Sequence, residues 1–317
     1  MENHPGNPFP TRKIHVELPD ESKNVDTEFI DDFWTVVVLL LEMFGNHVHY
    51  ATISMDGSET LGFGNLINIR SCLRHLPNLR GLKLLSFELP GNNAVFNDFY
   101  RRDPLPQLRH LESVELDMVD GAVMHHILNS CCIARNVTRL CLSICYYDDL
   151  VMPNVVSTFS NLEVLDAFIP INELERLGNL DEKPPLKKLS LELEPGRLNR
   201  PVNYRRIIAA LEPFANSLVH FELDTSFLVG DSAERLLINL PNLQKLVFSK
   251  YEGSLDPLIQ FKSLTYLEIT EYTVVPKHVE NYVIDLHKNE EKVFQSNIWI
   301  LIPSLETLCF KKYLYQL

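Results

Sequence analysis

The sequence predicts an α/β solenoid, a fold in which short parallel strands lie on one side and helices lie on the other. Two observations lead to this prediction. The phrase LPNLRGLKL at residues 76–84 returns as LPNLQKLVF at residues 240–248, and weaker copies of its leucine spacing occur between the two. Segments with helical spacing separate these copies. Because one such unit cannot bury its apolar side alone, the copies are expected to stack on one another.

The strands are predicted from the pattern L-x-x-L-x-L, which occurs about ten times when other apolar residues are allowed in place of Leu. Its first positions follow one another at irregular intervals of 21 to 41 residues. The L-x-L part has the period of two that is typical of a strand with one buried side, and the preceding Leu fills the same core. The predicted core positions are Val48/Ala51/Ile53, Leu79/Leu82/Leu84, Leu111/Val114/Leu116, Val137/Leu140/Leu142, Leu162/Leu165/Ala167, Leu186/Leu189/Leu191, Leu218/Phe221/Leu223, Leu243/Leu246/Phe248, Leu264/Leu267/Ile269 and Leu305/Leu308/Phe310.

Helices are predicted between the strands. Residues 122–131, 204–214 and 232–240 have apolar side chains at helical spacing, and residues 277–294 predict one more helix near the C-terminus. Since helices need more width than strands, the strands are expected to line the concave side of an arc and the helices its convex side. The predicted shape is a horseshoe.

A further helix is predicted ahead of the first repeat, over residues 26–44. It begins with acidic residues, which suit a helix N-terminus, and it stops at Gly45, which is expected to serve as a C-terminal cap. Its apolar run, residues 34–41, is too short to span a bilayer, so we expect it to face the core and to cap the open end of the first repeat. The predicted organisation is an N-terminal segment, residues 1–45, followed by a solenoid over residues 46–317.

The ten units resemble the leucine-rich-repeat superfamily. Their LPxLxxLxL phrasing and irregular lengths look most like the substrate-receptor region of F-box/leucine-rich-repeat proteins, and RLCLSIC at residues 139–145 is similar to the cysteine-containing repeat of that family. Of the Asn or Cys residues that the family carries just after the strand, Cys145 is kept, whereas other repeats have Phe87 or Val119 there. The resemblance implies a leucine-rich-repeat solenoid that serves as the substrate receptor of a ubiquitin ligase and contacts a cullin-ligase adaptor.

No F-box is visible in the sequence, although the resemblance implies one. Leu18 and Pro19 are not followed by the apolar spacing and the Trp-containing end of that motif. Two explanations stay open: the F-box has been lost, or the chain is a shortened version of a longer product.

The composition excludes several classes of partner. The formal net charge is −13 and the isoelectric point is near 5.3, which disfavours nucleic acid and anionic membranes as partners. The first residues contain no apolar segment of the kind that secretion requires, and six unevenly spaced cysteines do not form a disulfide framework. We expect an intracellular protein, cytoplasmic or nuclear, with reduced cysteines.

No residue pattern predicts catalysis. GFGNLI at residues 62–67 lacks the third glycine of a dinucleotide loop, and no nucleophile elbow, phosphate loop or HExxH motif occurs. The adjacent histidines at 125–126 and cysteines at 131–132 cannot close one zinc tetrahedron together. Cys141 is expected on the concave surface and Cys145 near the core, so they do not form a metal site either. We therefore expect a protein that is not an enzyme and has no metal and no cofactor.

The surface residues of the strands are the remaining candidates for function. The residue inside each L-x-L and the one just after it should face outward, and in the third to ninth repeats these positions hold seven acids and no base. Such a band of acids is typical of a binding surface, but it also fits a solvated strand face in an acidic protein. With the apolar and aromatic residues among them, the predicted partner-binding residues are Glu115, Asp117, Asp166, Phe168, Glu192, Glu222, Asp224, Tyr266 and Glu268.

Three functional hypotheses follow. The first is a recognition module that resembles F-box/leucine-rich-repeat receptors and binds a protein with a basic or mixed surface on its acidic concave face. The second is a standalone scaffold or inhibitor with no link to a ubiquitin ligase. The third, a GTPase activator resembling the Ran GTPase-activating proteins, has no matching catalytic arginine or long acidic tail.

Overall fold

The structure of the chain is a computed structural model, and it describes residues 13–17, 27–54, 63–87, 105–133, 135–143, 156–170, 183–194, 207, 210–224, 240–252, 261–274 and 304–315. The chain divides into two compact units, residues 1–151 and 152–317. Each unit is a stack of parallel strands, and each is described here by itself.

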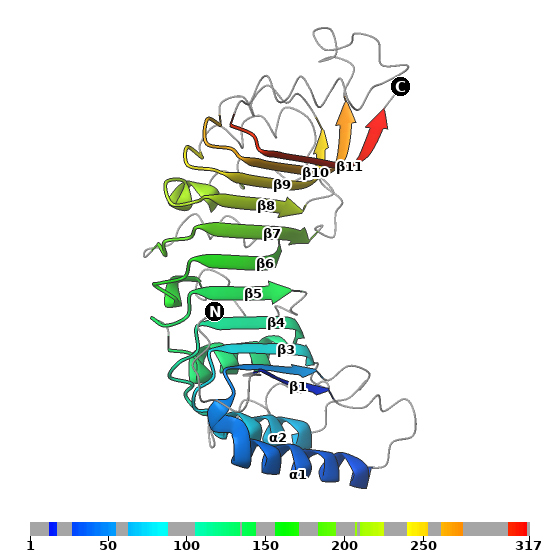
Figure 1. The fold of residues 1–317 in the computed structure, drawn as a ribbon, viewed down its shortest axis with the longest axis vertical. Coiled ribbons are helices and arrows are strands. Elements are labelled where there is room, and N and C mark those ends of the chain that lie inside the picture. The colour runs from blue at the N-terminus through cyan, green and yellow to red at the C-terminus, as the bar shows by residue number, and fades with distance from the viewer. Residues whose placement is uncertain are drawn as a thin grey trace, which may run out of the picture. The chain divides into compact units, whose positions relative to one another are not determined.

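The first unit contains five described strands that pair in parallel in the order of the chain (Figure 1). Its strands are β1 (Lys13–Glu17), β2 (Tyr50–Ser54), β3 (Gly81–Phe87), β4 (Ser113–Val119) and β5 (Arg139–Ser143). Its helices are α1 (Thr27–Phe44), the 3-10 turn η2 (Gly45–His47), α2 (Phe63–Arg74), α4 (Gly121–His126) and the π-helical turn η3 (Ile127–Cys131).

The second unit repeats the same arrangement with six described strands, again parallel and in chain order. They are β6 (Val164–Pro170), β7 (Lys188–Glu194), β8 (His220–Asp224), β9 (Lys245–Glu252), β10 (Tyr266–Val274) and β11 (Thr307–Tyr315). The helical residues described in this unit are short turns, including η4 (Glu212–Phe214).

The predicted core positions are confirmed wherever their side chains are described. Each is at most 8% exposed. Their alignment is also confirmed by the pairing register, which places Ala51, Leu82, Val114 and Leu140 opposite one another in the first unit. The second unit aligns Leu165, Leu189, Phe221, Leu246 and Leu267 in the same way. This repeated packing fits a leucine-rich-repeat-like solenoid in each unit.

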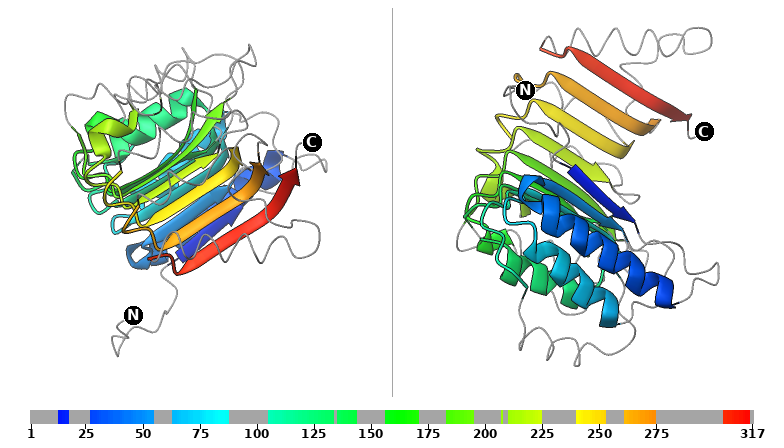
Figure 2. Two further views of the ribbon diagram at one scale, coloured as in Figure 1. Left: turned by 90° about the horizontal axis from the view of Figure 1, so that it is seen from above. Right: turned by 60° about the horizontal axis from the view of Figure 1, so that its bottom comes forward.

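The edge of the sheet in the first unit was not predicted. Strand β1 pairs with β2 from Lys13 opposite Tyr50 to Glu17 opposite Ser54, so one more strand lies outside the first predicted repeat. Helix α1 connects these two strands and lies beside α2 on one side of the sheet (Figure 2). Trp34 and Leu41 of α1 are at most 3% exposed, which confirms that this helix faces the core.

Gly45 ends α1, as predicted, but not for the predicted reason. A C-terminal cap of that kind requires a left-handed φ, and Gly45 has no positive φ. Instead, a Cβ at this position would lie 2.0 Å from the backbone oxygen of His75. Glycine is needed here because the start of η2 touches the backbone just after α2.

Other predicted helices are described only in part. Residues 122–131 are helical, as α4 and η3, and residues 207 and 210–214 are helical within the predicted segment 204–214. Residues 232–239 and 277–294 lie outside the described residues, as does Cys145. In the part of the chain that the structure describes, no helix is long and apolar enough to cross a membrane.

Backbone hydrogen bonds connect neighbouring repeats just before eight of the described strands, β3, β4, β5 and β7 to β11. One carbonyl oxygen accepts hydrogen bonds from two consecutive N–H groups of the next repeat, at 2.7 to 3.1 Å. In the first unit, the oxygen of His49 accepts from Arg80 and Gly81. The same arrangement recurs at the carbonyl groups of Arg80, Glu112, Glu163, Lys187, Val219, Gln244 and Thr265. These shared carbonyls set where each strand begins relative to the strand before it.

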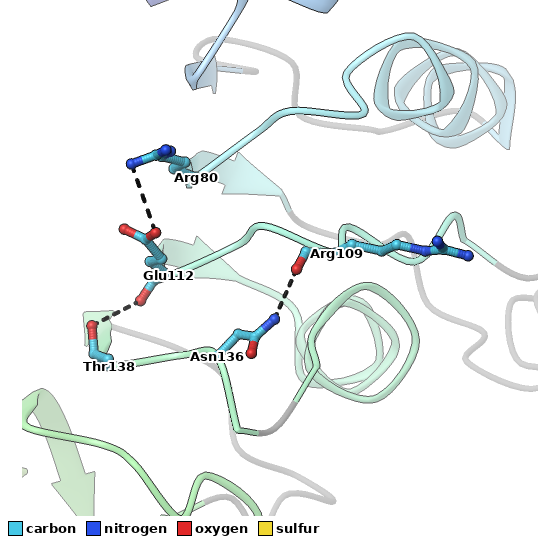
Figure 3. A network of polar contacts seen from close by, with 5 residues as sticks. All are labelled: Arg80, Arg109, Glu112, Asn136 and Thr138. Atoms are coloured by element: carbon cyan, nitrogen blue, oxygen red, sulfur yellow. Dashed lines mark hydrogen bonds and ion pairs between the residues drawn. The ribbon is translucent and has the colours of Figure 1, made fainter.

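An asparagine side chain adds a second connection, and it explains the repeated phrase LPNL. Asn78 donates to the backbone oxygen of Asn46, and Asn242 donates to that of Asn216, both at 2.8 Å. Asn136, which also directly precedes a core position, donates to the oxygen of Arg109 at 2.7 Å (Figure 3). Each of these bonds ties one repeat to the repeat before it.

We expect Asn242→Ala to lower the free energy of unfolding by about 1 kcal/mol, because it removes one hydrogen bond and leaves the carbonyl of Asn216 to water. Asn216→Ala is the matched control, since it keeps that carbonyl and its own side chain is exposed. Urea unfolding followed by circular dichroism measures both. Equal losses of stability in the two variants would show that the Asn242 side chain has no special role.

Candidate protein-interaction face

The candidate site is the open face of each sheet, the side opposite the buried leucines. The pairing register arranges its side chains in three rows across the strands. The first row holds the residues directly before the first buried strand residue, the middle row those between the two buried residues, and the third row those after them. In the second unit these rows include Val164, Lys188, His220, Lys245 and Tyr266; Asp166, Ser190, Glu222, Val247 and Glu268; and Phe168, Glu192 and Asp224.

All nine residues predicted to bind a partner lie on strands in these rows, although in two separate units. Glu115 and Asp117 belong to the middle and third rows of the first unit. The other seven belong to the second unit, with Tyr266 in its first row. Their role in binding stays a prediction, but their surroundings differ, and the differences separate them into two groups.

In the first unit, the chain itself supplies a cation to the predicted acids. Lys83 donates a hydrogen bond to Glu115 from the neighbouring strand, and this bond is the main reason why the pKa of Lys83 is raised. The pKa of Asp117 is also raised, first because the carboxyl group is partly buried. Lys83 lowers that pKa and Glu115 raises it. The negative charge of Glu115 is therefore balanced by a lysine of the same chain.

Two acids of the second unit also have contacts within the chain, one with a cation and one with a hydroxyl group. Lys188 lies 3.9 Å from Glu222. Tyr266 donates a hydrogen bond from its hydroxyl group to Glu268 at 2.8 Å, and Lys245 lies over the Tyr266 ring at 4.5 Å from the ring centroid. Tyr266 is thus held between a cation and a carboxylate of its own chain.

Three other carboxylates of the second unit form a group that we call the acidic triad: Asp166, Glu192 and Asp224. Within the described residues, none of them has an ion pair. The pKa of Glu192 is raised by partial burial and then by the charges of Asp224 and Asp166. Phe168 lies beside the triad, directly opposite Glu192 in the neighbouring strand. Among the described residues, the triad is the part of the predicted site where like charges gather without a paired cation.

The basic side chains of the open face were missed by the sequence analysis. Lys188, His220 and Lys245 stand opposite one another in the first row of β7, β8 and β9. The sequence did contain a signal for them. Each directly precedes a predicted core position, and it lies two residues before a position that was assigned to the open face, so strand alternation places it on the same face. The open face of the second unit therefore has a basic first row and an acidic third row, and it is not acidic throughout.

The cysteines and histidines show no arrangement for chemistry in the described part of the chain. No group of three or more His, Cys, Asp or Glu residues is placed to hold a metal ion there. Burial raises the pKa of Cys72 and of Cys132 to about 12, so these thiols stay protonated at neutral pH. Cys141 lies in the middle row opposite Glu115, as predicted, but it is only 9% exposed.

Comparisons with known proteins give no family for this chain. No model of a known protein family matches it, and no curated protein matches it. Among solved structures, a structure of the Rad7 and Elc1 complex in yeast is similar to it, with a TM-score of 0.44 and 13% sequence identity. The similarity covers 82% of this chain and 78% of the other.

Proposed function

We propose that this chain is a protein-recognition module without enzymatic activity, and that the open face of its second unit binds a partner through the acidic triad. One observation carries the proposal: the carboxylates of Asp166, Glu192 and Asp224 lie on neighbouring strands and have no ion pair among the described residues. Burial and the charges of the other two raise the pKa of Glu192. The partner is expected to present Lys or Arg side chains there.

The electrostatics of the triad support a cationic partner. Burial and neighbouring charges both disfavour the ionised form of Glu192, and a lysine or arginine placed beside it would oppose both effects. Phe168 offers an apolar surface next to these charges, and a mixture of aromatic and charged groups is common at the centre of interfaces. By contrast, Glu222 and Glu268 already have contacts within the chain, so they are expected to contribute less.

The resemblance to F-box/leucine-rich-repeat proteins supports a narrower form of the proposal. In that form, the chain is the substrate receptor of a ubiquitin ligase, and it contacts a cullin-ligase adaptor through a surface separate from the triad. The standalone scaffold is the alternative. Recovery of the adaptor with the chain separates the two.

The proposal is tested by charge reversal of the triad in the full chain. The variant Asp166→Lys, Glu192→Lys, Asp224→Lys is compared with Asp32→Lys, Glu212→Lys, Glu306→Lys, which changes the net charge equally at three other exposed acids. We expect the triad variant to lose at least about tenfold in affinity for the partner, because each substitution replaces an attraction with a repulsion. Affinity purification from native lysate identifies the partner, and titration with the purified partner measures the affinity.

Each outcome of this experiment is informative. A partner lost with the triad variant and kept with the control variant supports the triad as the binding site. An unchanged set of partners in a folded triad variant contradicts it. The cullin-ligase adaptor, if recovered equally with both variants, supports the substrate receptor, and its absence from every purification favours the scaffold.

A further inference from the structure

The first row of the second unit is the strongest cluster of basic side chains on the described open faces. Lys188, His220 and Lys245 occupy the same register position in three neighbouring strands, which lie side by side in Figure 1. Because neighbouring strands are about 4.8 Å apart, the three side chains leave the sheet within about 10 Å of one another. A single small ligand can therefore contact all three.

His220 stands at the centre of this row, where burial and two neighbouring lysines act on it. Its pKa is lowered to about 4, by burial and then by the charges of Lys188 and Lys245. The charged groups that face it are Lys188 from β7, Lys245 from β9 and Glu222 from its own strand, whose carboxylate lies 3.8 Å from Nε2. Since the ring is neutral at pH 7, this contact is not an ion pair. The two lysines outweigh Glu222 at this point.

The contacts of the three basic groups within the described chain are either long or not hydrogen bonds. The Nε2 atom of His220 is buried and has no hydrogen bond. Lys188 is 3.9 Å from the nearest carboxylate oxygen of Glu222, which is longer than a good hydrogen bond. Lys245 contacts the face of Tyr266, an arrangement that leaves its N–H groups able to donate to an anion. The two lysines can therefore donate hydrogen bonds to an oxyanion, and His220 joins them when a side-chain movement uncovers its Nε2 atom.

We propose that Lys188, His220 and Lys245 bind a doubly charged oxyanion of the phosphate class, and that His220 takes up a proton when the anion is bound. Two lysine ammonium groups and a protonated imidazole would neutralise such an anion. A carboxylate carries half the charge, so it is a weaker match to three positively charged groups. The identification of the anion as part of a protein partner rests on the proposed function, whereas binding of the anion itself does not.

The proposal also defines the charge pattern of a partner. The first and third rows are four residues apart along each strand, as Lys188 and Glu192 are on β7, which corresponds to about 13 Å. A partner that contacts both rows would carry an anionic group and a cationic group at that separation. A phosphorylated side chain near a lysine or arginine has this chemistry.

The test uses the full chain, with inorganic phosphate, sulfate and acetate as probes at constant ionic strength. The NMR signals of the His220 ring measure both the affinity and the pKa. We expect phosphate and sulfate to raise the His220 pKa, and we expect Lys188→Met with Lys245→Met to weaken their binding at least tenfold. Lys187→Met is the matched control, because Lys187 is an exposed neighbour that pairs with Glu163 at 2.7 Å. It should bind the anions as the unmodified chain does.

The pH dependence provides an independent readout. Sulfate does not titrate between pH 8 and 4, so any change in its affinity there reports the protein. Since bound anion favours protonated His220, the dissociation constant of sulfate should fall as the pH falls from the His220 pKa of the bound state to about 4, the His220 pKa of the free chain. His220→Gln should remove this dependence. A His220 pKa that none of the anions moves, or equal weakening by Lys187→Met, would overturn the proposal, and acetate binding as tight as phosphate binding would overturn the phosphate class. None of these results depends on the acidic triad.

Discussion

Replacing Gly45 with alanine is expected to lower the free energy of unfolding of the first unit by about 3 kcal/mol or more. The new Cβ would lie 2.0 Å from the backbone oxygen and 3.0 Å from the backbone carbon of His75. A backbone group cannot turn away as a side chain can, so the end of α1 and the segment after α2 must separate. Hydrogen exchange of the amides in β2 and β3 measures this change, because it resolves the stability of one unit.

Gly81→Ala is the matched control for this prediction. Its Cβ would lie 2.6 Å from a ring carbon of Tyr50, which is almost as close. However, Tyr50 is 45% exposed, and its ring can move into solvent at little cost. We expect a loss below about 1 kcal/mol for Gly81→Ala. If the two alanine variants are equally stable, the contact at Gly45 does not constrain the fold.

The second large effect is expected for Trp34→Ala, which should lower the free energy of unfolding by about 3 to 5 kcal/mol. Trp34 is 1% exposed, and its ring packs edge-on against Phe33 at 5.7 Å between ring centroids. Truncation removes the largest buried side chain of α1 and leaves a cavity in the helix layer. Urea unfolding measured by circular dichroism detects the change.

Met43→Ala, on the same helix, is the control for Trp34→Ala. Met43 is 70% exposed, so its truncation is expected to change stability by less than about 0.5 kcal/mol. A similar loss of unfolding free energy in both variants would mean that the buried contacts of Trp34 do not stabilise the unit.

The leucine positions were predictable because their spacing repeats, and repetition identifies a weak pattern that a single copy cannot. Leu111 and Val137, for example, occur in variable surroundings, yet both are 0% exposed, as predicted from alignment with Leu79. The same argument could not find β1. Its sequence, KIHVE, contains no leucine, and of its side chains only Val16 is buried. Its extended state depends on pairing with β2, which is far along the chain.

The positions after the strands show a second limit of pattern reading. Phe87 and Val119 stand where the resembling family has Asn or Cys, and both are 0% exposed. Each follows a residue with positive φ, Ser86 or Met118, and the pairing passes from Leu85 opposite Asp117 directly to Phe87 opposite Val119. A matching bulge in two neighbouring strands thus turns these apolar residues inward. Strict alternation from Leu84 would have placed them on the open face.

The charge of the open face was predicted only in part, because charge neutralisation depends on neighbours across strands. Glu115 and Glu222 read as unpaired acids in the sequence, but Lys83 and Lys188 on adjacent strands contact them. Within the described residues, the three members of the triad have no such contact, although Asp166 and Glu222 both lie opposite Ser190. Which side chains become neighbours across strands depends on the pairing register. The buried leucines set that register, although they are not part of the site.

The shared carbonyl groups before the strands have a consequence for how such a chain can change during evolution. Each of the strands β3, β4, β5 and β7 to β11 is positioned by two N–H groups bonded to the preceding repeat, and these bonds lie directly at the start of the strand. Segments can therefore gain or lose residues while the rows of the open face keep their register, and the free-energy cost of a longer loop grows only slowly with its length. This tolerance accounts for intervals that range from 21 to 41 residues between repeats that nevertheless align. Insertions between strands can therefore accumulate while the side chains of the open face keep their neighbours across the strands.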